Sequence, residues 1–158
     1  MSSGDRWFPR NGETFPVYNV KYAESRDAIY CKRDGKVCVD YKNPEEHALA
    51  RPCVIKENGI YKMWYSYKGA DYRIGYAESK DGLRWKRLDE KVGIDVSPDG
   101  FDSVMQVYGF IISHKGKKHM FYSGNEYGKE GIGYATWVYS RRAPLAKCNL
   151  NGTPLSSG

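Results

Sequence analysis

The stretch "YRIGYAESKDGLRWKR", from Tyr72 to Arg87, decides the fold because the chain contains a close copy of it. Fifty-four positions earlier the chain reads "YNVKYAESRDAIYCKR", from Tyr18 to Arg33. In each copy, apolar and polar residues alternate on both sides of a turn, as in two short strands. A period near 50 residues, built of short strands, indicates a repeat architecture.

A third copy lies towards the C-terminus. The segment "MWYS" at 63–66 matches "MFYS" at 120–123, and "IGYA" at 74–77 recurs at 132–135. The offsets of 54, 57 and 58 residues therefore describe one repeating unit. In the central unit, alternation and turn residues predict four antiparallel strands joined by hairpins, at 51–57, 60–68, 71–79 and 83–89.

Four-stranded units at this period predict an all-β chain that folds as a partial β-propeller of the five-bladed type. The chain would supply about two and a half four-stranded blades: the outer two strands of one at 17–33, a complete blade at 51–89, and the inner three strands of another at 105–137. We expect residues 1–16 to form an N-terminal extension, 17–137 to hold the blades, and 138–158 to form a loose C-terminal tail.

Such an open stack would leave apolar sheet faces in water at both ends. We therefore expect a tight homodimer, or a higher oligomer, in which two copies complete a five-bladed ring. A β-sandwich-like arrangement of the single chain is the alternative.

Charge and composition narrow the functional classes. The net charge is +6, but Lys and Arg are spread along the chain, which favours a solvated surface over nucleic-acid binding. The four cysteines lack zinc-site spacing, so we expect no metal or other cofactor, and free thiols in a reducing compartment fit best. A disulfide between Cys31 and Cys38 is the alternative in an extracellular protein. The absence of a long apolar stretch and of a signal-like N-terminus predicts no membrane association and favours the cytoplasm.

Function is expected where the inner strands of a propeller approach its axis. The polar residues at the start of these strands include Glu46 and Arg51 in the central unit, and Asp102 and Ser103 in the next. Two carboxylates about 5 to 10 Å apart would suit glycoside hydrolysis, which needs one acid and one base or nucleophile. Arg51 is either a channel contact or the ion-pair partner of Glu46, and Asp102 is alternatively a turn-capping residue.

Three segments resemble a known family: "EEHALARPCVIKENGIYKMWYSYKG", "YRIGYAESKDGLRWKRLDEKVGIDVSPDGFDSVMQVYGF" and "KGKKHMFYSGNEYGKEGIGYAT". Together they look like the C-terminal half of bacterial five-bladed propeller glycosidase-like proteins, which are similar to the arabinanase, invertase and levansucrase superfamily. The resemblance covers about residues 17–136, and its motifs are specific in combination. It implies a propeller fold and a sugar or oligosaccharide as ligand.

The chain departs from the family pattern at two places. Where the family has Asp-Ser-Glu-Met, the chain has Val104 in place of the Glu. The family's Asn-Gly-Asn-Gly-Tyr-Gly appears as "SGNEYG" at 123–128, with Glu126 where a Gly is usual. The superfamily's catalytic carboxylates also lie partly on blades that these 158 residues do not include. These departures weaken the interpretation of the chain as an enzyme and leave that question open.

Our hypothesis from the sequence assigns roles to six residues. Glu46 and Asp102 would be the catalytic acid and base, and the sugar contacts would be Arg51, Ser103, Tyr108 and Asn125. The predicted function is a carbohydrate-binding propeller related to glycoside hydrolases, with weak or no hydrolase activity, assembled by oligomerisation. The alternative is a noncatalytic oligomeric binding or scaffold module derived from a truncated glycosidase gene, which would account directly for Val104.

Overall fold

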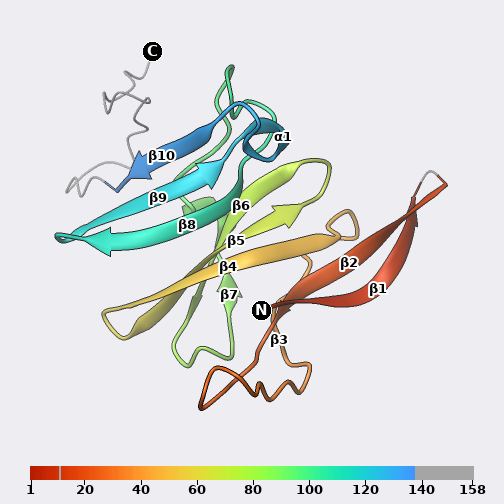
Figure 1. Ribbon diagram of the computed structural model, residues 1–158, viewed down its shortest axis with the longest axis vertical. Helices are drawn as coiled ribbons and strands as arrows, with labels where there is room; N and C mark the ends of the chain where they lie inside the picture. The colour runs from red at the N-terminus through yellow and green to blue at the C-terminus, as the bar shows by residue number, and fades with distance from the viewer. Residues whose placement is uncertain (11, 138–158) are drawn as a thin grey trace.

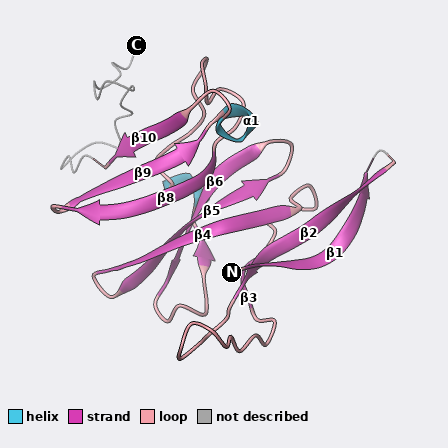
Figure 2. Ribbon diagram, viewed as in Figure 1, coloured by secondary structure: helices cyan, strands magenta, loops and turns pink. Residues whose placement is uncertain are grey.

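The computed structural model describes residues 1–10 and 12–137, and nearly all of its regular structure is β-strand (Figure 2). Figure 1 shows three groups of strands that follow one another along the chain. The first blade contains β1 (Ser2–Arg10), β2 (Glu13–Lys21) and β3 (Val37–Val39). The central blade contains β4 (Ala48–Glu57), β5 (Ile60–Lys68), β6 (Tyr72–Ser79) and β7 (Lys86–Arg87). The third blade contains β8 (Val107–His114), β9 (Lys117–Ser123) and β10 (Ile132–Thr136), and two short helical segments are η1 (Asp89–Lys91) and α1 (Asn125–Gly128).

The central blade is a complete antiparallel unit, in the order β4-β5-β6-β7. Its first turn is formed by Asn58 and Gly59, which both have positive φ, at 51° and 78°. This is the conformation that two-residue hairpins favour, because it matches the right-handed twist of the strands. Lys115 and Gly116 repeat it between β8 and β9, with φ of 49° and 73°. The four strands predicted for this blade are confirmed, although the fourth is shortened to two residues.

The first blade differs from the prediction in two respects. β1 lies entirely within residues 1–16, which we expected to be an extension, and it pairs antiparallel with β2. The strand expected before Arg33 is absent, and a single bridge between Glu24 and Lys32 takes its place. Residues 24–37 are all exposed, so alternation in this segment has no core to bury and does not produce a strand. β3 instead pairs with β2, and β2 joins the central blade through one parallel bridge, Tyr18 to Ala48.

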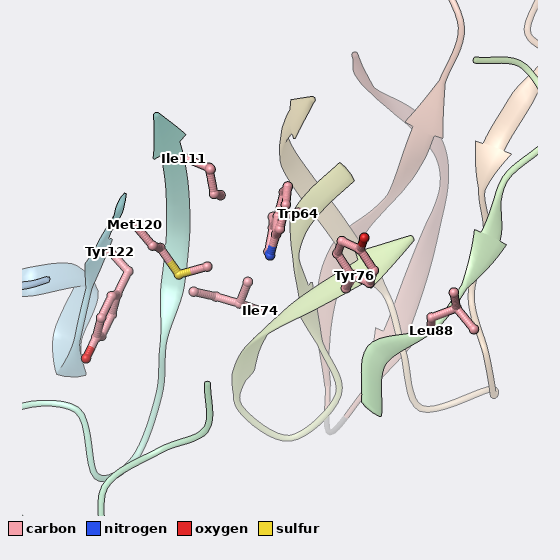
Figure 3. Packing of buried hydrophobic residues seen from close by; sticks show 7 residues of the cluster. All are labelled: Trp64, Ile74, Tyr76, Leu88, Ile111, Met120 and Tyr122. Atoms are coloured by element: carbon pink, nitrogen blue, oxygen red, sulfur yellow. The ribbon is translucent and has the colours of Figure 1, made fainter. Parts of the chain in front are cut away.

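The blades pack face to face. Side chains alternate across β5, so that Met63 and Tyr65 face the first blade and pack with Val20 and Val39. Trp64 faces the third blade, in a cluster with Ile74, Tyr76, Leu88, Ile111, Met120 and Tyr122 (Figure 3). Sheets that stack through both faces in sequence are propeller blades, so the chain is an all-β partial propeller and the β-sandwich alternative is wrong.

The structure also bears on the predictions made for the cysteines and for membrane-spanning segments. Cys31, Cys38 and Cys53 are free thiols. The predicted tail at 138–158 and Cys148 lie outside the described residues. Among the described residues, no helix has the length and apolar character to cross a membrane.

Candidate functional site

β4 and β8, the first strands of their blades, lie next to each other. The Sγ atom of Cys53 is 3.3 Å from the backbone nitrogen of Ile111. Each strand contains a bulge, and the left-handed residue in each is Arg51, with φ of 52°, and Tyr108, with φ of 61°. The two residues are 57 positions apart and therefore equivalent in the repeat. A left-handed φ costs a residue other than glycine about 1–2 kcal/mol, so its occurrence at both sites marks a feature of the blade itself.

The two bulges bring Arg51 and Tyr108 into contact. The guanidinium carbon of Arg51 lies 4.9 Å from the centroid of the Tyr108 ring, within cation–π range. The backbone N–H of Tyr108 donates to Ser66 Oγ at 2.8 Å, which fixes the bulge. Burial raises the pKa of Tyr108, so its hydroxyl stays protonated and can both donate and accept hydrogen bonds.

More tyrosines extend this contact. Tyr127, in α1, stacks on Tyr108 with ring centroids 6.1 Å apart, and it meets Tyr72 edge-on at 5.9 Å. The hydroxyls of Tyr72 and Tyr18 are 3.1 Å apart. Tyr127 is 53% exposed and has a left-handed φ of 61°, so part of its ring is open to solvent. We call Tyr18, Arg51, Tyr72, Tyr108 and Tyr127 the tyrosine cluster.

Glu46 lies in a different environment from the one we predicted. It is 6% exposed, and its carboxylate forms a two-pronged ion pair with Arg87, at 2.7 and 3.1 Å. The backbone N–H of Lys42 also donates to it, at 2.8 Å. Arg51 is therefore not its partner, and the ion-pair interpretation of Arg51 is wrong.

Arg87 is the centre of a buried network. Its guanidinium also contacts Asp89, at 2.7 Å, and lies over the rings of Tyr65 and Tyr67, at 5.4 and 5.3 Å. Burial alone would lower the pKa of Arg87, but its hydrogen bonds with Glu46 and Asp89 raise the pKa above its ordinary value. The network therefore links the loop before β4 with β5, β7 and η1.

Asp102 is also buried and fully engaged. It is 2% exposed, and it accepts hydrogen bonds from Gln106 Nε2 at 2.6 Å and from the Tyr122 hydroxyl at 2.9 Å. Burial and this hydrogen bond raise the pKa of Tyr122. The side chains of Asp102 and Glu46 belong to separate hydrogen-bond networks. The structure does not bring these two carboxylates together at an open surface.

Ser103 and Asn125 hold the loop before β8. The side-chain oxygen of Asn125 accepts from the backbone N–H groups of Val104 and Met105, at 2.9 and 3.1 Å. Its amide nitrogen donates to Gly100 O at 3.0 Å and lies 3.4 Å from Ser103 Oγ. Val104, which stands where the family has a carboxylate, is exposed. Asn125 and Ser103 are thus brought together, and Asn125 is two positions before Tyr127 in the chain.

A cleft of about 500 Å³ borders both carboxylate networks through Asp89 and Gln106. Other residues that line it include Tyr67, Arg73, Ile74 and Asp95. Glu46 and Asp102 themselves do not line it. Within residues 1–10 and 12–137, no group of three or more His, Cys, Asp and Glu side chains could hold a metal ion.

Sequence reasoning missed four residues of these arrangements. Tyr18 and Tyr72 are the first residues of the two repeated segments, and that shared position was a usable signal. Tyr127 follows a Gly-Asn-Glu sequence. Glu126 and Tyr127 both have a left-handed φ, and neither is a residue type that predicts this conformation. Arg87 was missed because its equivalent in the repeat, Arg33, is exposed, and the sequence does not show that Arg87 pairs with carboxylates.

Known proteins resemble the chain in sequence and in structure. No protein-family model matches the chain. Two uncharacterized proteins of Mycobacterium tuberculosis, from strains CDC 1551 and H37Rv, are 43% and 42% identical to it over 116 residues, or 73% of the chain. The chain spans 39% of their length. A 1,2-beta-oligomannan phosphorylase of a Thermoanaerobacter species is 34% identical over 76 residues, covering 45% of this chain and 26% of that protein.

Solved structures of low sequence identity share the fold. A family 117 glycoside hydrolase of Zobellia galactanivorans has a TM-score of 0.62 at 20% identity, covering 76% of this chain and 37% of that one. A family 32 beta-fructofuranosidase of Bombyx mori, in complex with sucrose, has a TM-score of 0.59 at 12% identity, covering 92% and 30%. Another glycoside hydrolase has a TM-score of 0.58 at 19% identity, covering 94% and 43%. The chain therefore shares the β-propeller fold of these enzymes over the part of the fold that it spans.

Proposed function

We propose that the chain binds carbohydrate at the tyrosine cluster and has weak or no hydrolase activity. The observation that carries this proposal is the pair of equivalent bulges that set Arg51 against Tyr108, with the half-open ring of Tyr127 stacked above them. Aromatic rings with polar groups beside them suit sugars, whose apolar ring faces stack and whose hydroxyls form hydrogen bonds. Asn125, two positions before Tyr127 in the chain, and its neighbour Ser103 are the remaining candidate hydroxyl contacts.

The surroundings of the two candidate catalytic carboxylates support weak or absent hydrolysis. An acid–base pair has to reach the glycosidic oxygen and a water molecule or the anomeric carbon. Glu46 is occupied by Arg87 and Asp102 by Gln106 and Tyr122, and both are buried. A catalytic role for them would require both networks to open.

Exposed apolar residues support assembly into a larger ring. On the outer face of the third blade, Phe110 is 58% and Ile132 64% exposed, and Ile112 and Phe121 are exposed beside them. A second copy that covers this face would continue the stack of blades towards a closed ring, and the proposed oligomer is a homodimer. The alternative, a noncatalytic oligomeric scaffold, is favoured by the same face and by Val104.

Binding can be tested by calorimetric titration with oligosaccharides of β-1,2-mannan, arabinan and fructan. We expect Tyr127→Ala to weaken binding about tenfold, because it removes the stacked ring, and Tyr127→Phe to retain most of the affinity. Tyr30→Ala is the matched control, since Tyr30 is exposed in a distant loop. Failure of every oligosaccharide to bind would overturn the carbohydrate proposal.

Assembly can be tested by light scattering. We expect a dimer mass at micromolar concentration and a monomer for Ile132→Lys, because a charge on the open face opposes association. A parent chain with the mass of a monomer would contradict the proposed dimer and leave the binding proposal intact.

A further inference from the structure

A second cleft, of about 440 Å³, lies between the β1–β2 hairpin and the start of the central blade. We call it the hairpin cleft. The side chains that matter here are those of Phe8, Glu13, Phe15, His47, Lys68 and Asp71. Two of its walls come from the N-terminal hairpin, and the others come from the residue before β4 and from the turn between β5 and β6.

Aromatic rings form part of the wall. Phe15 and His47 have ring centroids 6.2 Å apart at an interplanar angle of 54°, and Phe8 lines the same cleft. Phe8 is exposed and Phe15 half-buried, so both rings present apolar surface to solvent. Apolar rings left open inside a concave surface are typical of ligand sites.

The polar groups of the cleft keep most of their hydrogen-bonding capacity within the described part of the chain. Glu13 and Asp71 form no side-chain hydrogen bond or ion pair with the part of the chain whose side chains the structure describes. The Lys68 ammonium has no carboxylate partner there, and His47 uses only Nδ1, which lies 3.2 Å from Glu45 O. Unlike the carboxylates of Glu46 and Asp102, these groups are available to a ligand.

The charges of the cleft favour a neutral ligand. Two carboxylates, one ammonium group and one imidazole supply both acceptors and donors. A strongly anionic ligand would meet the two carboxylates, and a cationic one would meet the ammonium group. The hydroxyl groups of a neutral polyhydroxyl compound can donate hydrogen bonds to the carboxylates and accept them from the ammonium group.

Lys68 connects the two regions, because it lines the hairpin cleft and its ammonium group also contacts a residue of the tyrosine cluster. The Lys68 ammonium lies 5.3 Å from the centroid of the Tyr72 ring, and the Tyr72 hydroxyl is 3.1 Å from that of Tyr18. We propose that the hairpin cleft is a second sugar subsite, and that the ligand is a neutral linear oligosaccharide long enough to occupy both. This inference rests on the proposed carbohydrate binding at the tyrosine cluster.

The experiment is a calorimetric titration with disaccharide to hexasaccharide members of the β-1,2-mannan, arabinan and fructan series. We expect affinity to rise with chain length by about tenfold in total, as the longer ligands reach the hairpin cleft. Phe15→Ala should remove this gain and leave disaccharide binding unchanged, whereas Tyr127→Ala should weaken every length. Asp71→Ala, in an exposed turn, should reduce the gain without any risk to the fold, and thermal unfolding checks both variants.

The outcomes separate the two proposals. If Phe15→Ala and Asp71→Ala both match the parent at every length, the hairpin cleft is not a subsite, although binding at the tyrosine cluster stands. If an oligogalacturonide binds more tightly than every neutral oligosaccharide, the neutral-ligand assignment is overturned. If no member of the series binds the parent chain, carbohydrate binding itself fails.

Discussion

The loops Ser25 to Arg33 and Ser79 to Arg87 are two copies of one sequence motif, and they share their internal hydrogen bonds. In each, the Asp carboxylate accepts from the backbone N–H groups two and three residues further on, at 2.9 Å for Asp27 and 2.8 Å for Asp81. Each serine hydroxyl also donates to that Asp. The local sequence alone is therefore sufficient to form this turn.

The segments after the turn differ between the copies. After Ser79, the chain pairs as β7, the Trp85 ring packs against the core between the first and central blades, and Arg87 enters the buried network. After Ser25, the corresponding Cys31 and Arg33 are exposed and the pairing is reduced to one bridge. The motif encodes the turn, but the strand requires a tertiary partner.

The largest expected difference in stability is between substitutions of Arg87 and of its equivalent, Arg33. Arg87→Met should destabilise the fold by about 3–5 kcal/mol, because it leaves the buried carboxylate of Glu46 and the partly buried carboxylate of Asp89 without their cation. Arg33→Met, at the equivalent exposed position, should change stability by no more than about 0.5 kcal/mol. Urea unfolding monitored by tryptophan fluorescence measures both. Equal losses would show that the two copies are not as different as their surroundings suggest.

A smaller effect is expected from the aromatic residue of the motif. Trp85→Ala should cost about 2–3 kcal/mol, less than for a fully buried tryptophan, because the ring is half-buried. It also loses the hydrogen bond from the indole N–H to Gly82 O, at 2.9 Å. Cys31→Ala is the matched control and should be nearly neutral in the same urea titration. If Trp85→Ala left stability unchanged, the packing between the first and central blades would contribute little to the free energy of unfolding.

The third test concerns the tip of the turn. Ala28 adopts a φ of 60° where the other copy has Gly82 at 74°. Ala28→Gly should stabilise the chain and Gly82→Ala destabilise it, each by up to about 1 kcal/mol, because only glycine is free of strain there. A new Cβ at Gly82 would meet nothing closer than the Tyr61 ring at 3.8 Å, so packing should not obscure the result. Changes of the same sign in both variants would contradict this explanation.

The smallest effect is a shift in titration. Hydrogen bonds from backbone N–H groups hold the pKa of Asp27 and of Asp81 below the ordinary 3.8. A lowered native pKa means that these bonds stabilise the fold fully above pH 3.8 and lose their effect as the pH falls below it. Carbon-13 NMR of the carboxyl groups should show both titrating late on acidification, with Asp27→Asn and Asp81→Asn to assign the signals. An ordinary pKa for Asp27 alone would show that the first copy does not form the turn.

The sequence predicts the fold through properties that the repeat displays directly. The Asn58-Gly59 pair predicts a hairpin turn, and the alternation in β5 predicts which side chains face each neighbouring blade. Both predictions succeed because they depend only on residues close together in the sequence. β1 was missed because "RWFPR" has no counterpart in the repeated segments. The strand before Arg33 was wrongly expected because alternation does not reveal whether a core exists to receive it.

The candidate site could be predicted only in part. Glu46, Asp102 and Arg51 were placed near the inner strands, but the identity of their partners depends on contacts between distant segments. The pairing of Glu46 with Arg87 joins residues 41 positions apart. Tyr127 joins the cluster through the left-handed conformation of α1, and no periodic pattern encodes that conformation.

The equivalent bulges of β4 and β8 give the architecture a modular property. Because the backbone sets the direction in which the bulged residue projects, exchanging Arg51 or Tyr108 would alter the chemistry offered to a ligand while leaving the blade intact. Each additional blade of the same design would contribute one more such position. Evolution could thus diversify recognition one sheet at a time, by changing a single codon per blade.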